Sequence, residues 1–335
     1  MGYEPRFVIT PSLLSIVEEI ARLRQRIHDA TVQLAWIPAL QKDARTRNTH
    51  ASTSIEGNPL TLAEVRAIAD GGVAPAAGPR SAREVVNYLA GLRFIEQHGD
   101  AAALTHEDIF ELQRILATGV MDQGEPGRYR DQCVWVGSYL PPAPEDVPQL
   151  MTDLLAWWNE SSSDLSPVIT SAIIHYRFEA VHPFSDGNGR TGRALALWEL
   201  YRRGFDTHHI FSVDEYYWED RVAYYDALGR VHKDDEDLTS WLEYCAEGLR
   251  QTLDNVWSRI TLVTPPDAAP LVLRPRQERL LQLLAVQGSM APSEIWEQLS
   301  VSKQGAMDLI NPLLEAGVVE KIGTKKSGRY RLKTP

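Results

Sequence analysis

The chain has 335 residues, of which 44% are apolar and 24% charged, and its formal net charge is −11. This length is sufficient for two domains, and the composition excludes a disordered chain. The negative charge argues against a protein whose whole surface coats nucleic acid or anionic lipid. Two distant cysteines, the absence of a signal-peptide pattern and the lack of an apolar run of about 18 residues indicate a reduced, cytoplasmic protein with no membrane partner.

Helical patterns dominate the first 260 residues. Thr10 followed by Pro11 predicts a helix start, and apolar residues then recur with a helical period up to Ile27. Capping-box patterns predict three further helix starts, at residues 61–64, 81–84 and 105–108. Later segments also carry helical patterns, at residues 167–182, 190–203, 213–232 and 238–262. We therefore predict a mainly α fold.

One segment differs from its helical surroundings. Residues 127–142 read GRYRDQCVWVGSYLPP, which is rich in aromatic and β-branched residues and ends at two prolines. This composition predicts a short β-hairpin among the helices.

The character of the chain changes after residue 260. Four prolines in residues 261–276 predict a linker. From Leu271 onward there are ten basic and six acidic residues, a net charge of +4, so the rest of the chain carries −15. The linker and the reversed charge together predict a separate small domain.

A chemically dense stretch, VHPFSDGNGRTGR, occupies residues 181–193. Pro183 disfavours a helical conformation at His182, so a helix should end there and leave the imidazole at the mouth of a loop. Gly187 and Gly189 leave backbone amides free to face an anion. The next helix begins at the same place, and its N-terminus also favours negative charge.

Two arginines follow on the first turn of that helix. The guanidinium groups of Arg190 and Arg193 suit phosphate oxygens, which leaves Asp186 to hold Mg²⁺ beside a bound polyphosphate. The unperturbed pKa of a histidine is about 6.5, so His182 can act as a base near neutral pH. Each feature taken alone is more often structural, as a tight turn, a helix-end histidine or solvated arginines. Their joint spacing favours a polyphosphate site.

Residues 182–193, HPFSDGNGRTGR, resemble without a gap the motif H-P-F-x-(D/E)-G-N-G-R-x-x-R of the Fic family, and the resemblance covers most of residues 1–260. It implies transfer of AMP from ATP to a hydroxyl group of a target protein, with release of pyrophosphate. It also implies that His182 deprotonates the hydroxyl, Asp186 holds Mg²⁺ and Arg193 holds the γ-phosphate end. The residues implied around the phosphates are Gly187, Asn188, Gly189, Arg190, Thr191 and Gly192.

By the same resemblance the hairpin is a target-docking flap. Its exposed strand edge would pair with an extended segment of the target protein and align the hydroxyl group. The residues implied beside the nucleotide are Val136, Gly137, Ser138 and Tyr139 of the flap, with Tyr224 and Tyr225 near the adenine. An ordinary surface hairpin and a tyrosine pair in the core are the alternatives.

Residues 52–57, STSIEG, match the inhibitory pattern (S/T)-x-x-x-E-(G/N) of Fic proteins through Ser52, Glu56 and Gly57. A Glu56 carboxylate paired with Arg193 would occupy the guanidinium that the γ-phosphate needs. The resemblance therefore implies an inhibitory helix over about residues 45–57. A plain helix end capped by Gly57 is the alternative, and both interpretations can hold together.

The C-terminal residues 276–335 resemble a winged helix–turn–helix, with helices near 276–285, 292–299 and 302–310 before a two-stranded wing. The wing is basic, as is typical of contact with a phosphate backbone. Its basic residues are Lys321, Lys325, Lys326, Arg329 and Arg331. The third helix offers only Lys303 and Gln304 to DNA, and Pro312 should break its end. A DNA partner and a protein partner both stay open.

The expected order is an N-terminal helical region (1–105), a Fic catalytic core (106–262), a linker (263–275) and a winged helix–turn–helix (276–335). We expect an autoinhibited, Mg²⁺-dependent protein adenylyltransferase whose partners are ATP and a hydroxyl-bearing target protein. The alternatives are a DNA-binding regulator that uses the core as a sensor, and a Fic enzyme that transfers phosphate or UMP. Removal of AMP and formation of a homodimer are left open.

Overall fold

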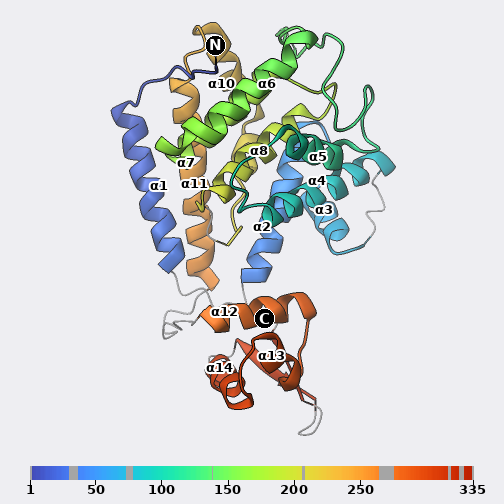
Figure 1. Cartoon of the computed structure of the whole chain (residues 1–335), viewed down its shortest axis with the longest axis vertical. Helices are drawn as coiled ribbons and strands as arrows, with labels where there is room; N and C mark the ends of the chain where they lie inside the picture. The colour runs from blue at the N-terminus through green and yellow to red at the C-terminus, as the bar shows by residue number, and fades with distance from the viewer. Residues whose placement is uncertain are drawn as a thin grey trace. The chain divides into compact units, whose positions relative to one another are not determined.

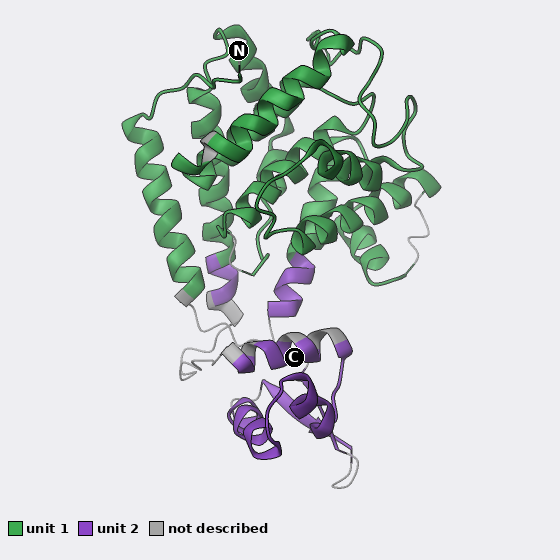
Figure 2. Cartoon of the chain, viewed as in Figure 1, with its two compact units in different colours: residues 1–28, 44–256 green, residues 29–43, 257–335 purple. Residues whose placement is uncertain are grey.

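The computed structural model describes residues 2–29, 37–72, 78–137, 139–205, 208–263, 275–315, 318–323 and 328–333. They form two compact units (Figure 2). Unit 1 comprises residues 1–28 and 44–256, and unit 2 comprises residues 29–43 and 257–335. The motif at residues 181–193 therefore lies in unit 1.

Helices build almost all of unit 1 (Figure 1). In chain order they are α1 (Pro11–Asp29), α2 (Ile37–Ile55), α3 (Leu62–Ala69), α4 (Pro79–Gln97), α5 (His106–Ala117), α6 (Val147–Ala156), α7 (Pro167–Val181), α8 (Asn188–Arg202), α9 (Asp214–Glu219), α10 (Arg221–Lys233) and α11 (Thr239–Val263). The first residues of α2 and the last of α11 belong to unit 2. Short irregular turns flank α6, at η1 (Pro144–Asp146), η2 (Trp157–Ser161) and η3 (Ser162–Asp164). None of the described helices is both long and apolar enough to cross a bilayer.

Helix starts follow the local capping chemistry. The predicted caps at Thr61 and Thr105 are confirmed. Each threonine side chain accepts a hydrogen bond from the backbone amide of the third helical residue, and the side chain of that residue accepts one from the threonine amide. The predicted cap at Ser81 is wrong. Helix α4 begins earlier, at Pro79 behind Gly78, because proline is already preorganised for the first helical position.

Helices α7 and α8 pack against each other in the interior of unit 1, and α4, α5 and α6 pack around them. Most residues of both helices are buried, so neither helix has a continuous polar face. The indole of Trp241 in α11 donates a hydrogen bond to the carbonyl of Ala172 in α7 (2.8 Å). This covered pair provides the rigid support for the loop between α7 and α8.

A fully buried carboxylate ties α8 to its neighbours. Glu199 accepts hydrogen bonds from Trp158 Nε1 (2.6 Å), Thr170 Oγ1 (2.7 Å) and Arg202 Nη2 (2.9 Å). Its carboxylate also lies 3.4 Å from Nη1 of Arg203. Because several donors depend on one acceptor, removing that acceptor leaves them all in the core.

We predict that Glu199→Ala lowers the free energy of unfolding by about 3–5 kcal/mol, because it strands buried donors and a guanidinium. Urea denaturation followed by circular dichroism measures this loss. Glu18→Ala is the matched control, since Glu18 is exposed and pairs with Arg22 on the surface of α1. A Glu199→Ala variant as stable as the control would show that the network contributes little.

The segment 127–142 is a shorter hairpin than the sequence predicts. A single bridge joins Val136 and Tyr139, with backbone hydrogen bonds of 3.0 and 2.9 Å. Instead of cross-strand pairing, Arg130 organises the segment, because its buried guanidinium donates to the carbonyls of Gln132 (3.0 Å) and Pro142 (2.5 Å). Trp135 and Leu140 are exposed.

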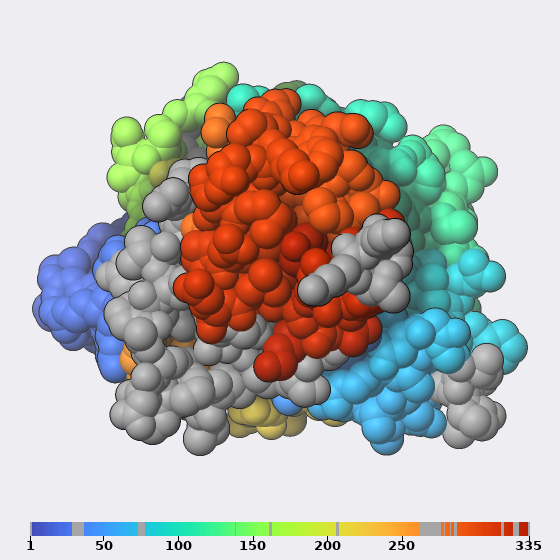
Figure 3. All heavy atoms as spheres, turned by 90° about the horizontal axis from the view of Figure 1, so that it is seen from below, coloured from blue at the N-terminus to red at the C-terminus, as the bar shows by residue number. Residues whose placement is uncertain are grey.

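Unit 2 contains the tail, whose surface Figure 3 shows in orange to red. Helices α12 (Pro275–Gln287), α13 (Pro292–Gln298) and α14 (Lys303–Glu315) precede the antiparallel strands β1 (Val319–Ile322) and β2 (Arg329–Leu332). This is the predicted order of elements. The prediction that Pro312 breaks the third helix is wrong, since it lies inside α14. The linker residues 264–274, together with Lys325 and Lys326, lie outside the described residues.

Candidate active site

Helix α7 ends where the sequence predicts. Val181 is its last residue, and His182 adopts a left-handed conformation (φ 49°, ψ 58°) while its amide still donates to Phe178 (2.9 Å). Arg130 Nε donates to the carbonyl of His182 (2.8 Å), and the amide of Arg130 donates to Pro183 (2.9 Å). The hairpin segment thus holds the histidine in a conformation that a non-glycine residue rarely adopts.

The loop after His182 is closed by Asn188. Its Oδ1 accepts from the amide of Phe184 (2.9 Å), and its Nδ2 donates to the carbonyl of the same residue (2.7 Å). The Asn188 side chain therefore shapes the loop through two hydrogen bonds to the backbone of Phe184. Gly187 caps α8 with φ 79°, a conformation that glycine adopts at little cost.

Two residues of the implied cradle support α8 from the inside. Thr191 is fully buried, and its hydroxyl donates to the carbonyl of Gly187 (2.8 Å). Gly192 faces Glu179 so closely that a Cβ there would lie 2.5 Å from Glu179 Oε1. Neither residue lines the two pockets of the site, so their contribution is to helix packing.

Most of the other predicted residues meet in one cavity of about 510 Å³, which we call pocket A. Its lining includes Val136, Gly137, Tyr139, His182, Gly189, Arg193, Tyr224 and Tyr225, together with Glu56 and Glu179. The volume is in the usual range for a small-molecule site. Ser138 lies outside the described residues.

A second, more polar cavity, pocket B, adjoins the first through Glu56, which lines both. Its charged lining consists of Glu56, Arg80, Glu84, Asp122, Asp186 and Arg190. Buried Arg190 lies 3.5 Å from Asp186 and 3.9 Å from Glu84, but its Nε and Nη1 make no hydrogen bond to a described residue. A buried guanidinium with unused donors suits an anionic ligand.

Asp186 is the candidate metal residue. Its Oδ1 accepts a hydrogen bond from the Gly187 amide (2.5 Å) and lies 3.5 Å from Arg190 Nη2. Among the described residues no three His, Cys, Asp or Glu side chains cluster as a metal site. One partly exposed carboxylate beside a guanidinium that suits phosphate fits Mg²⁺, which commonly takes most of its ligands from phosphates and water.

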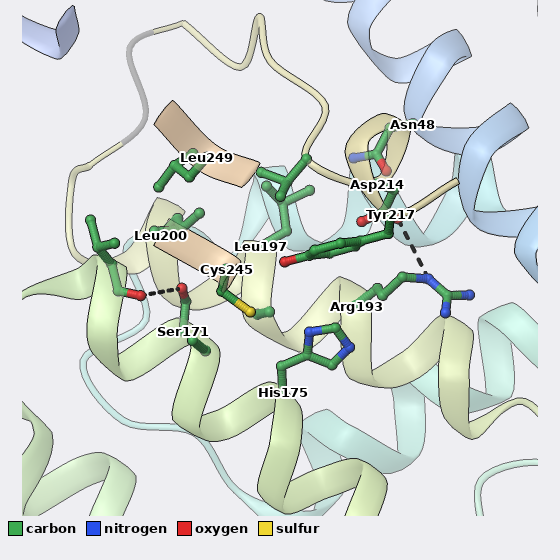
Figure 4. Close-up of a pocket in the computed structure, with 14 residues that line it drawn as sticks. Asn48, Ser171, His175, Arg193, Leu197, Leu200, Asp214, Tyr217, Cys245 and Leu249 are labelled. Atoms are coloured by element: carbon green, nitrogen blue, oxygen red, sulfur yellow. Dashed lines mark hydrogen bonds and ion pairs between the residues drawn. The ribbon is translucent and has the colours of Figure 1, made fainter. Parts of the chain in front are cut away.

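Arg193 is almost completely buried and contacts two acids. Its Nη2 donates to Glu56 Oε1 (2.8 Å) and to the carbonyl of Ser52 (3.0 Å), and its Nε donates to Ser52 Oγ (2.8 Å). Nε also lies 3.7 Å from Asp214 Oδ2, as Figure 4 shows. Asp214 in turn accepts from the hydroxyl of Tyr88 (3.0 Å). The Glu56–Arg193 pair expected from the sequence is therefore present.

Tyr88 and Asp214 were not found by sequence reasoning. Neither residue belongs to a local sequence motif. Only the three-dimensional structure reveals them, because it brings both close to Arg193. Arg193 also borders a small internal cavity of about 30 Å³ that is lined by Asn48, His175 and Tyr217 (Figure 4). Its wall includes the unpartnered Oδ1 of Asn48, and a volume of this size holds a water molecule or two.

Burial and the arginines set the charges in the site. Burial raises the pKa of Glu56, but Arg193 opposes this effect and the net pKa lies below its usual value, so the carboxylate is ionised. Burial lowers the pKa of His182 to about 4, with the carbonyl of Glu179 acting in the opposite direction. The imidazole is therefore neutral at neutral pH and able to accept a proton.

The two predicted tyrosines have different environments. Tyr224 is buried, and its hydroxyl bonds His175 Nε2 (3.0 Å), so it is a core residue whose edge reaches pocket A. Tyr225 is 42% exposed and presents its ring at the same pocket. On the flap side, the ring of Tyr139 stacks on His232 with centroids 3.9 Å apart. Aromatic surfaces thus border both sides of the cavity.

The family model and the curated relatives that match this chain all carry the name Fic. The model of the Fic/DOC family matches residues 103–200. Protein adenylyltransferase fic-1 of Caenorhabditis elegans is 34% identical over 249 residues, which are 71% of this chain and 47% of that protein. Protein adenylyltransferase Fic of Drosophila willistoni is 32% identical over 288 residues, 84% of this chain and 54% of that protein. The chain thus spans about half the length of these curated relatives.

Solved structures extend the likeness to the full chain. A Fic family protein from Desulfovibrio desulfuricans superposes with a TM-score of 0.68 at 28% identity, with 99% of each chain covered. A fragment of Fic-1 from C. elegans superposes with a TM-score of 0.64 at 27% identity, over 76% of this chain and 73% of that one. On the family match, the curated relatives and these structures, the chain belongs to the Fic family.

Proposed function

We propose that the chain is an autoinhibited protein adenylyltransferase that transfers AMP from ATP to a Ser, Thr or Tyr hydroxyl of a target protein. The observation that supports this most is the meeting of the neutral imidazole of His182 and the guanidinium of Arg193 in pocket A. A base and a phosphate-binding cation in one cavity are what transfer at phosphorus requires. The names of the curated relatives support the same activity.

In the proposed reaction, His182 Nε2 takes the proton of the target hydroxyl, and the oxygen attacks the α-phosphorus of ATP. The bond from the α-phosphorus to the bridging oxygen of the β-phosphate breaks, and pyrophosphate leaves. Arg193 holds the γ-phosphate end in the competent state, and Arg190 with the Gly187 and Gly189 amides stabilises charge on the phosphates. Bound Mg²⁺, held by Asp186, would neutralise phosphate charge.

The walls of pocket A suggest where the rest of ATP and the target protein bind. Tyr225 can stack on the adenine, with Val136 and Gly137 on the flap side. The exposed backbone of the 127–142 flap would pair with an extended segment of the target and direct its hydroxyl toward His182. This arrangement selects the target by backbone shape more than by a single side chain.

Autoinhibition follows from competition for one cation. The Glu56 carboxylate occupies Arg193 Nη2 at 2.8 Å, which is the group that a γ-phosphate would need. A second anion brought to the same guanidinium is repelled by Glu56. ATP can still enter pocket A, but its phosphates are then displaced from in-line geometry.

We predict that Glu56→Gly raises AMP transfer and self-modification by about ten- to a hundredfold, because a charged hydrogen bond of about 1.5–3 kcal/mol no longer competes for Arg193. Mass spectrometry after incubation with ATP and Mg²⁺ measures the added mass and identifies the transferred group. The matched control is Glu56→Gly combined with His182→Ala, which should carry no added AMP. Equal modification of wild type and Glu56→Gly would refute the inhibitory role of Glu56.

Asp186 provides the second test. We predict that Asp186→Asn, in the Glu56→Gly background, raises the Mg²⁺ concentration for half-maximal transfer by at least about tenfold, because the amide is a much poorer ligand. Asp122→Asn is the control in the same pocket, since Asp122 pairs with Arg80 (2.9 Å) and is left out of the proposed metal site. An unchanged Mg²⁺ requirement in Asp186→Asn would remove Asp186 from the metal site.

Transfer of phosphate and transfer of UMP are two alternative activities of the same site. A Fic core that transfers phosphate or UMP would give a different added mass, so labelled nucleotides presented to Glu56→Gly separate these activities. Removal of AMP from a modified target and assembly into a homodimer stay open, and both can be measured on the same purified protein.

Unit 2 carries the alternative of a DNA-binding regulator. Its three helices and two strands follow the order of a winged helix–turn–helix. Two wing arginines are already paired, Arg329 with Glu294 (2.8 Å) and Arg331 with Glu320 (2.6 Å), which favours a protein contact over a phosphate backbone. Binding of the full chain to duplex DNA that weakens steeply with salt would instead support the regulator.

A further inference from the structure

One acid in pocket A has no part in the proposed reaction. Glu179 lies on α7, three residues before His182, and its side chain is only 14% exposed. Its Oε1 makes no hydrogen bond to a described residue, although it is buried. Gly192 of α8 has no side chain, which is why this carboxyl group can approach the helix so closely. A buried carboxyl oxygen without a hydrogen bond is costly and therefore calls for a functional explanation.

The imidazole of His182, which Glu179 faces, also has a buried polar atom without a hydrogen bond to a described residue. Nδ1 of His182 is buried and has no hydrogen bond of normal geometry among the described residues. It lies 3.8 Å from Glu179 Oε2. Nδ1 of His182 thus faces one oxygen of a carboxyl group whose other oxygen, Oε1, has no hydrogen bond to a described residue, and a shift of about 1 Å would bring Nδ1 and Oε2 to hydrogen-bonding distance. Contacts of this kind are often long before substrate binds.

Charged and titratable groups from four elements surround the carboxyl group. They are His182 directly after α7, Arg193 on α8, Glu56 at the end of α2 and Tyr224 on α10. Burial raises the pKa of Glu179 to about 8, while Arg193 acts to lower it and Glu56 to raise it further. The group therefore changes from a neutral acid to a carboxylate across the weakly alkaline range.

On the basis of the proposed function, we propose that Glu179 is a positioning residue for His182. Its carboxylate accepts the Nδ1 proton, which keeps Nε2 unprotonated and directed at the target hydroxyl. When Nε2 takes the hydroxyl proton, the imidazolium keeps both protons and the neighbouring carboxylate stabilises its charge. The proton thus moves once, from the target oxygen to Nε2, and Glu179 itself remains ionised.

The kinetic test uses the Glu56→Gly background, in which transfer is released. We predict that adding Glu179→Gln lowers kcat by about ten- to a hundredfold and changes KM for ATP by less than about twofold, since the ring loses its orienting anion. In the Glu56→Gly protein with Glu179 intact, kcat should rise with pH as the Glu179 carboxyl group ionises. The rise should level off near or below pH 8, because loss of Glu56 lowers the pKa of Glu179. The Gln variant should lack this rise.

Glu243→Gln is the control, because it removes the same charge in unit 1 from a residue that contacts Thr10 and lies outside pocket A. It should leave kcat and the pH profile unchanged. Equal kcat and the same alkaline rise in Glu179→Gln would overturn the proposal. A similar loss of kcat with the rise retained would also overturn it, since that pattern indicates a purely structural role.

A second measurement depends neither on which group the enzyme transfers nor on whether Glu179→Gln folds. NMR of the His182 ring nitrogens in wild-type protein should show a step near pH 8, as the adjacent carboxyl group ionises. Folded Glu179→Gln should lack that step. Ring shifts that stay constant from about pH 6.5 to 9.5 in wild type would overturn the proposal even if the variant unfolds. Failure of AMP transfer with an intact NMR step would instead reject only the proposed function.

Discussion

The site depends on the guanidinium of Arg193, which is buried and cannot stay unpaired without a large cost in free energy. Ser52 and Glu56 at the end of α2 and Asp214 at the start of α9 now satisfy it. In the proposed active state, in which the end of α2 withdraws, Asp214 would stay beside Arg193 at 3.7 Å, because it is itself bonded to Tyr88. The guanidinium donors that Ser52 and Glu56 now use would then be open to another anion. Competition between a carboxylate and a phosphate for these donors is a sufficient basis for inhibition.

The rest of the site is held by hydrogen bonds and packing, which would allow the one Glu56–Arg193 contact to control the proposed activity. Arg130 fixes the backbone of His182, and Asn188 closes the loop on Phe184. Helices α7 and α8 beneath that loop are covered by their neighbours, and Glu199 links α8 to the surrounding core. The proposed phosphate donors and base are thus preorganised, and the proposed activation needs no large rearrangement apart from the exit of Glu56. Pocket A and pocket B meet at that residue, so its position affects both the nucleotide and the candidate metal site.

Local chemistry allowed much of this to be predicted. Pro183 ends α7 at the expected place, two of three capping boxes hold, and the dense motif together with STSIEG leads to the His182, Arg193 and Glu56 cluster. Tertiary contacts account for what sequence reasoning missed. Asp214 contacts Tyr88 and Arg193, and Arg130 contacts His182, which lie far from them along the chain. Asn188 and Thr191 are buried and bond to the backbone, which the sequence does not reveal. The hairpin is short because Arg130, and not a strand ladder, organises it.

The most direct test of competition for Arg193 is a pair of crystal structures with Mg²⁺ and a non-hydrolysable ATP analogue, one of wild type and one of Glu56→Gly. We expect the γ-phosphate within hydrogen-bonding distance of Arg193 only in Glu56→Gly, with the Glu56–Arg193 pair retained in wild type. In the variant, the α-phosphate should also face Nε2 of His182. A wild-type structure in which the γ-phosphate binds Arg193 beside an intact Glu56 pair would contradict the competition, as would a nucleotide outside pocket A in both proteins.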